Sequence, residues 1–123
     1  MIILDTSALI EITKGSEKGA QIVSHIQEES YATTSINMHE LLLLARSDEK
    51  KEFKEFLNAI KIYPYDRDCV EKSVFIEREL MQKEKLINKL DILIASICLA
   101  QGAGILTLDE DFKRVPGLKA III

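Results

Sequence analysis

The sequence is poor in the residues that mark linkers, disulfide-stapled folds and low-complexity segments. Its 123 residues include no tryptophan, two prolines, five glycines and two cysteines. Without a linker or an internal repeat, the chain is expected to form a single domain spanning residues 1–123. Cys69 and Cys98 lie inside helix-like apolar patterns, which is typical of buried free thiols in a reducing compartment.

An excess of basic residues is also missing. The chain has 16 Lys and Arg residues against 20 Asp and Glu residues, for a net charge of −4. This balance argues against a simple basic nucleic-acid-binding module, although it is compatible with an enzyme that acts on nucleic acid. No apolar run reaches the ~18 residues of a membrane span. No signal-peptide pattern opens the sequence. We therefore expect a cytoplasmic protein with no membrane contact.

What the chain does contain is an alternation of short apolar strands with amphipathic helices. Apolar residues make up 47% of it, enough for a core without disulfides. Period and composition predict strands over residues 2–4, 31–34, 62–65, 105–108 and 118–123. They predict helices over residues 6–14, 18–29, 36–46 (with Ser35 as the N-cap), 49–60, 66–85 (starting at Asp66 or Asp68) and 91–101. Such alternation favours an α/β fold in which helices cover both faces of a parallel sheet.

Acidic residues follow two of these strands. Asp5 comes directly after the first strand, and Asp109 and Asp111 follow the strand at 105–108. In parallel sheets, ligands bind at the carboxyl ends of the strands. The alternative is that Asp5 caps the next helix and that Asp109 and Asp111 are solvated turn or cap residues. Acids at two strand ends of one small sheet are a more specific signal than either alone.

Two more acids lie on apolar helices. Glu40 is predicted to share a helix face with Ile36, Asn37, Leu43 and Leu44. A carboxylate buried on such a face is costly unless it is paired or bound to a cation. The alternative is that Glu40 lies at the margin of the core and reaches water. Asp91 is predicted to open an apolar helix, where it could instead be an N-cap favoured by the helix dipole.

No Lys or Arg obviously neutralises this group of acids. Clustered carboxylates repel each other, and a divalent cation removes the repulsion. All-oxygen ligands suit Mg²⁺ or Mn²⁺, and neither the histidines nor the cysteines have the spacing of a zinc site.

Four motifs carry a resemblance to a known family: LDTSALI, SINMHELL, LDILIASICLAQGAGILTLDEDF and VPGLKAI. In this order and spacing they resemble the PIN-domain ribonucleases, in particular the VapC-type toxins of toxin–antitoxin pairs. The resemblance covers essentially the whole chain and implies a PIN-like three-layer α/β fold, with a central five-stranded parallel sheet flanked by helices. It places the family's catalytic, metal-binding acids on Asp5, Glu40, Asp91 and Asp109, a further acid on Asp111, and supporting hydroxyls on Thr6 and Thr107.

The same resemblance implies an endoribonuclease that uses Mg²⁺ (or Mn²⁺) to hydrolyse RNA phosphodiester bonds. It also implies a cognate VapB-like antitoxin and a homodimer. The segment KEKLINKLD before Asp91 departs from the family by being more basic and less rich in glycine.

Two other interpretations compete with this one. A haloacid-dehalogenase-like phosphohydrolase also places an Asp after an apolar strand, but it needs a second Asp two residues later, where this chain has Ser7. A non-catalytic interaction module with the same fold would use the acids only as caps.

Overall fold

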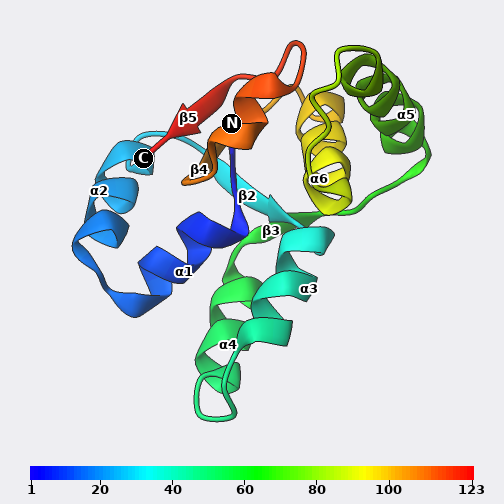
Figure 1. Ribbon diagram of the computed structural model, residues 1–123. Helices are drawn as coiled ribbons and strands as arrows, with labels where there is room; N and C mark the ends of the chain where they lie inside the picture. The colour runs from blue at the N-terminus through cyan, green and yellow to red at the C-terminus, as the bar shows by residue number, and fades with distance from the viewer.

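The computed structural model describes residues 1–123 and is built around a five-stranded sheet in which every pair of neighbours is parallel (Figure 1). The strand order is β3-β2-β1-β4-β5. The strands are β1 (Ile2–Leu4), β2 (Tyr31–Thr34), β3 (Lys61–Tyr63), β4 (Gly104–Thr107) and β5 (Ala120–Ile122). The first strand made is therefore the central one, with β2 on one side and β4 on the other.

Helices cover both faces of the sheet, so the expected three-layer α/β fold is confirmed. They are α1 (Thr6–Lys14), α2 (Glu17–Ile26), α3 (Ser35–Leu44), α4 (Lys50–Ala59), α5 (Arg67–Gln82) and α6 (Lys89–Ala100), and a 3₁₀ helix, η1 (Glu110–Arg114), follows β4. Figure 1 shows α5 and α6 together on one side of the sheet and the α1–α2 hairpin on the other. No helix combines the length and the apolar character that crossing a membrane requires.

The core is split in two because side chains along a strand alternate between the faces of the sheet. Ile3 and Ile105 point into the core shared with α5 and α6. Ile2, Leu4 and Leu106 point into the core shared with α1 to α4. Apolar side chains on both faces explain why β1 and β4 read as continuous apolar segments in the sequence.

The ends of α3 and α6 differ from the predicted ones, and both differences bear on the acidic residues. The cap of α3 is Thr34, whose hydroxyl accepts a hydrogen bond from the backbone N–H of Asn37, so the helix begins at Ser35 itself. The cap of α6 is Asn88, whose side chain accepts from the backbone N–H of Leu90. That helix therefore begins two residues before Asp91, and the prediction that Asp91 opens it was wrong.

Other predicted ends move by a few residues. The second helix ends at Ile26 instead of residue 29, and β3 ends at Tyr63, just before Pro64, which has no N–H to donate to a neighbouring strand. The strand β4 lies one residue earlier than predicted, and β5 is shorter than predicted at both ends. Cys69 and Cys98 are buried free thiols, as expected.

Tight packing of α1 on α2 depends on glycine. Gly15 ends α1 with a positive φ of 66°, which an L side chain rarely adopts. At Gly19 a Cβ atom would lie 2.2 Å from the backbone oxygen of Glu11. The two helices therefore form a hairpin that a larger residue at position 19 would force apart.

Candidate functional site

The acids predicted from the sequence meet at the carboxyl ends of the central strands. Asp5 follows β1, and Asp109 follows the neighbouring strand β4. Glu40 comes from α3 and Asp91 from the first turn of α6. The pKa of Asp91 is raised to about 7, mainly by burial and then by the negative charges of Asp5, Asp109, Glu40 and Asp111, in that order of effect. All four of these acids thus lie close enough to act on Asp91.

Asp5 is the most firmly held of these carboxylates, with only 6% of its surface exposed. Its Oδ2 atom accepts hydrogen bonds from the Thr107 hydroxyl at 2.6 Å and the Ser7 hydroxyl at 3.2 Å. Its Oδ1 atom accepts from the Asn37 side-chain amide at 3.0 Å. Asp5 occupies the N-cap position of α1, but its side chain makes no capping hydrogen bond. The interpretation of Asp5 as a helix cap was therefore wrong.

Glu40 lies at the edge of the core. Its Oε1 atom accepts a hydrogen bond from the Thr6 hydroxyl at 2.9 Å. The expectation that its helix face is buried was wrong for one end of that face, because Leu43 and Leu44 are 74% and 63% exposed. The alternative that Glu40 sits at the margin of the core is confirmed, because its side chain is half-buried.

The remaining acids have different surroundings. Asp91 is the third residue of α6 and half-buried, and the N-cap that it was predicted to provide is Asn88. Asp109 does cap, because its Oδ1 atom accepts from the backbone N–H of Asp111 at 2.9 Å at the start of η1. Asp111 pairs with Arg114 at 3.7 Å. Of the capping alternatives weighed from the sequence, the one for Asp109 is confirmed.

Two polar residues of the site were missed by sequence reasoning. Asn37 is fully buried, one turn before Glu40 on the same face of α3. The Ser7 hydroxyl bonds Asp5 and accepts from the backbone N–H of Leu108 at 3.0 Å, which ties α1 to the end of β4. The available signal for Asn37 was a polar residue on a face otherwise predicted to be apolar.

The donor set of the site fits a hard divalent cation. Asp5, Glu40, Asp91 and Asp109 take part in none of the seven ion pairs of the structure, so no Lys, Arg or His neutralises them at contact distance. Carboxylate and hydroxyl oxygens are the ligands that Mg²⁺ and Mn²⁺ prefer. No three His, Cys, Asp or Glu side chains are grouped as a preformed metal site. The acids are gathered but held apart, as uncompensated like charges are.

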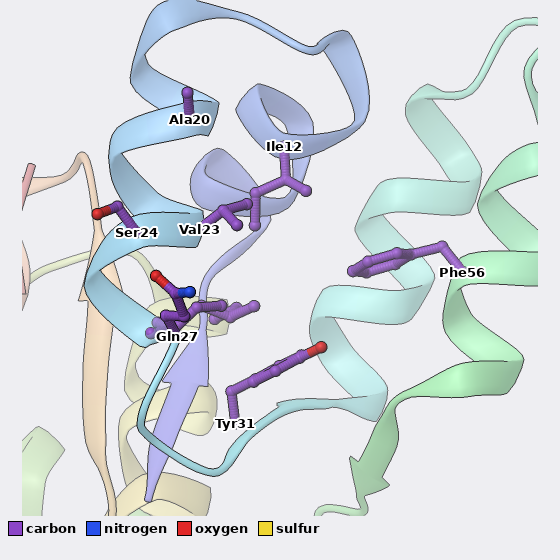
Figure 2. A pocket seen from close by; sticks show the side chains of 9 residues that line it. Ile12, Ala20, Val23, Ser24, Gln27, Tyr31 and Phe56 are labelled. Carbon is purple, nitrogen blue, oxygen red and sulfur yellow. The ribbon is translucent and has the colours of Figure 1, made fainter.

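A separate apolar groove runs between the α1–α2 hairpin and α4. Figure 2 shows Phe56 of α4 pointing toward Ile12 and Val23 across the groove, with Tyr31 at one end. The groove encloses about 480 Å³ and is lined by Leu4, Ile12, Ala20, Val23, Ser24, Ile26, Gln27, Tyr31 and Phe56. None of the acids of the candidate site lines this groove.

The chain is similar to known proteins over nearly its whole length. The family model for the PIN domain matches residues 2–118. Ribonuclease VapC2 of Rickettsia felis is 32% identical over 93 residues, which cover 71% of this chain and 69% of that protein. Ribonuclease VapC1 of the same organism is 28% identical over 130 aligned residues, which cover 99% of this chain and 96% of that protein.

Solved structures show the same arrangement. The crystal structure of VapBC2 from Rickettsia felis, bound to a promoter DNA fragment, matches with a TM-score of 0.81 and 27% identity, covering 98% of this chain and 97% of that one. DNA-bound VapBC from Salmonella typhimurium matches with a TM-score of 0.82 and 21% identity, covering 97% and 95%. The second likeness establishes the fold alone.

Proposed function

This chain belongs to the PIN domain family, and from that membership we propose that it is a VapC-type endoribonuclease that uses Mg²⁺ or Mn²⁺ to hydrolyse RNA phosphodiester bonds. The observation that carries the proposal is the set of four acids without basic partners at the carboxyl ends of β1 and β4. Two similar proteins bear the name ribonuclease, which supports RNA as the substrate. We place the activity in the cytoplasm.

In this proposal Asp5, Glu40, Asp91 and Asp109 hold the cation, and Asp111 adds a more exposed carboxylate beside them. A bound divalent cation supplies a polarised phosphate oxygen and a water of lowered pKa that can attack phosphorus. Thr107 and Thr6 hold Asp5 and Glu40 by the hydrogen bonds that they donate. Asp91, with its pKa near 7, gives up its proton when positive charge enters the site.

The two competing interpretations are less well supported. A module that uses its acids as caps accounts for Asp109 alone, because the side chains of Asp5 and Asp91 cap no helix. A phosphohydrolase with Asp5 as nucleophile needs a second Asp two residues later. Ser7 stands at that position and donates its hydroxyl to Asp5 Oδ2.

The function is tested by Mn²⁺ calorimetry followed by RNA cleavage, on the wild type, Asp91→Asn and Asp68→Asn. Asp68 is the matched control, because it is an exposed aspartate in the first turn of α5. We expect the wild type and Asp68→Asn to bind Mn²⁺ and cut RNA, and Asp91→Asn to do neither. A folded wild type that neither binds Mn²⁺ nor cuts RNA would contradict the proposed function and favour the non-catalytic module.

The apolar groove supports a protein partner. The two solved structures described above are VapBC complexes. We propose that a VapB-like antitoxin binds this chain by inserting apolar side chains of a peptide segment between the α1–α2 hairpin and α4. A groove between helices suits an amphipathic segment. The uncompensated acids would attract a basic side chain of the same antitoxin.

A second apolar surface lies on α5 and supports the homodimer. Val70, Val74 and Met81 are 44%, 45% and 55% exposed and follow at helical spacing, with Phe75 beside them at 57%. Such a stripe on a helix is typical of a contact with another helix. We propose that two copies of the chain pair through this stripe on α5.

Two valines of similar exposure allow each surface to serve as the control for the other. Val23→Asp should prevent a complex with a VapB-like antitoxin while leaving the homodimer intact. Val74→Asp should turn the dimer into a monomer while leaving antitoxin binding intact. Size-exclusion chromatography with light scattering reads both outcomes. Loss of both assemblies from one variant would contradict the assignment of separate surfaces.

A further inference from the structure

We propose that Asn37 is a positioning residue of the acidic site, which aims the Thr6 hydroxyl at Glu40, anchors Asp5, and thereby raises the affinity for the divalent cation. The inference rests on the proposed function, since it concerns the same cation site. It is independent of which RNA is cut, because the property that Asn37 controls is the binding of the ion.

Asn37 is a fully buried side chain whose polar groups are all used. Its Oδ1 atom accepts from the Thr34 hydroxyl at 2.7 Å. Its Nδ2 atom donates to Asp5 Oδ1 at 3.0 Å and to Thr6 Oγ1 at 2.9 Å. Burying an amide is costly unless such bonds are made. An apolar residue would fill this position in the core at lower cost, so the amide is retained for what it bonds.

The orientation of the amide follows from its neighbours. A carboxylate only accepts hydrogen bonds, so the side of Asn37 that faces Asp5 must be the NH₂ group. Thr34 also fixes the position of the side chain, because its hydroxyl accepts from the Asn37 backbone N–H at 3.1 Å while donating to Oδ1. The amide is therefore locked at both ends.

A directed chain of hydrogen bonds results. Because the Thr6 oxygen receives an N–H from Asn37, the Thr6 proton points elsewhere, and Glu40 Oε1 lies 2.9 Å away to accept it. Bonds linked in this way strengthen one another. Asn37 thus connects two acids that are 35 residues apart in the sequence, Asp5 at the end of β1 and Glu40 on α3.

The bonds also determine which oxygens remain open. Asp5 Oδ2 already accepts two hydrogen bonds, whereas Oδ1 accepts one and keeps a lone pair. Glu40 Oε1 accepts from Thr6, and Oε2 accepts from no protein group in the structure. The oxygens that keep an open lone pair for a cation are therefore Asp5 Oδ1 and both Glu40 oxygens, of which Oε2 is the more open. Asn37 holds both carboxylates in this orientation.

A purely structural role for Asn37 makes a different prediction. If Asn37 only fills the first turn of α3, its loss should lower stability and leave the affinity for Mn²⁺ unchanged. Ser73 provides the control for such a loss. It is 5% exposed and bonds Tyr65 at 2.6 Å and the Val70 carbonyl at 2.8 Å, on α5 away from the acids.

The experiment measures Mn²⁺ affinity by calorimetry and stability by urea unfolding in the wild type, Asn37→Ala and Ser73→Ala. We expect both variants to be destabilised, and only Asn37→Ala to bind Mn²⁺ about 10- to 100-fold more weakly, as is usual when a partner of a metal ligand is lost. Wild-type affinity in folded Asn37→Ala would overturn the positioning role. Absence of Mn²⁺ binding in the wild type would instead overturn the proposed function.

A double-mutant cycle with Thr6→Val tests the route to Glu40. If Asn37 acts through Thr6, the variant with both substitutions should bind Mn²⁺ within about 3-fold of Asn37→Ala alone, because the second substitution removes a link already broken. Independent, multiplying losses would overturn the route. Should Asn37→Ala fail to fold, Asn37→Ser takes its place. Its single hydroxyl proton cannot serve both Asp5 and Thr6, so the same weakening is expected and wild-type affinity would overturn the proposal.

Discussion

Replacing Asp91 by Asn should stabilise the metal-free protein, although it removes a proposed catalytic residue. The Asp91 carboxyl is half-buried and surrounded by four other acids, which together with burial raise its pKa from 3.8 to about 7. In the absence of a cation, ionising Asp91 at neutral pH works against folding. An asparagine of the same shape carries no charge and avoids this cost.

The sign of the pH dependence follows from the raised pKa. Between about pH 4 and pH 7 the folded protein holds a proton on Asp91 that the unfolded chain has lost, so stability falls as pH rises through this window and levels off above it. A shift of about three units corresponds to about 4 kcal/mol for a fully buried group. Because Asp91 is only half-buried and screened by water, we expect ~1–2 kcal/mol.

The assay is urea unfolding in EDTA at about pH 5 and about pH 8, on the wild type, Asp91→Asn and Asp68→Asn. At the higher pH, Asp91→Asn should be more stable than the wild type by ~1–2 kcal/mol, or roughly 3–8 °C in Tm for a domain of this size. The gain should shrink at the lower pH. Asp68→Asn should lose only the ~0.3–1 kcal/mol of a charge at a helix N-terminus.

Two results would refute this reasoning. The first is an Asp91→Asn variant that is less stable than the wild type at about pH 8 in EDTA, because the ionised carboxylate would then be stabilising without a metal. The second is an Asp91→Asn variant whose stability changes with pH in the same way as that of Asp68→Asn. Adding Mn²⁺ should make the wild type more stable than Asp91→Asn. The wild type and Asp68→Asn gain the stability that comes from binding a ligand in the folded state, and Asp91→Asn does not.

Three further substitutions test other parts of the structure. Gly19→Ala should lower the free energy of unfolding by ~1–3 kcal/mol, since its Cβ would lie 2.2 Å from the Glu11 oxygen, and an unchanged urea midpoint would contradict the close helix contact. Glu84→Gly should raise it by ~0.5–1 kcal/mol, because Glu84 has a φ of 53°, and thermal unfolding measures the gain. Thr107→Val should lower the free energy of unfolding by ~1–3 kcal/mol and weaken Mn²⁺ binding, because it removes the 2.6 Å hydrogen bond to Asp5. Calorimetry measures the affinity for Mn²⁺, and an unchanged affinity would contradict that role.

Local pattern predicted most of the fold because the chain is locally consistent. The strands at 2–4 and 31–34 and the helix at 6–14 agree with the structure residue by residue, since apolar runs and a terminal glycine mark their ends. The predicted helix starts were wrong where two residues could cap the same helix. Thr34 took the place of Ser35, and Asn88 that of Asp91. Which of two nearby polar residues caps a helix depends on how the chain approaches the helix, and the local sequence alone does not specify that approach.

The acids of the candidate site could be predicted from the sequence, but the polar residues that hydrogen-bond them could not. Asp5, Glu40, Asp91 and Asp109 were found because charged residues at strand ends and on apolar helices are unusual. Asn37 was missed because its partners, Asp5 and Thr6, are 32 and 31 residues away in the sequence. These bonds exist only because β1 lies beside β2, and that pairing is a property of the whole sheet.

The strand order also determines when a growing chain acquires this site. Asp5 and Glu40 are made early, but the central strand β1 gains its second neighbour only when β4 is complete at Thr107. Thr107 and Asp109 reach the site with that strand, after more than four-fifths of the 123 residues have been synthesised. A product that stops before β4 therefore lacks Thr107 and Asp109, and with them a finished acidic centre.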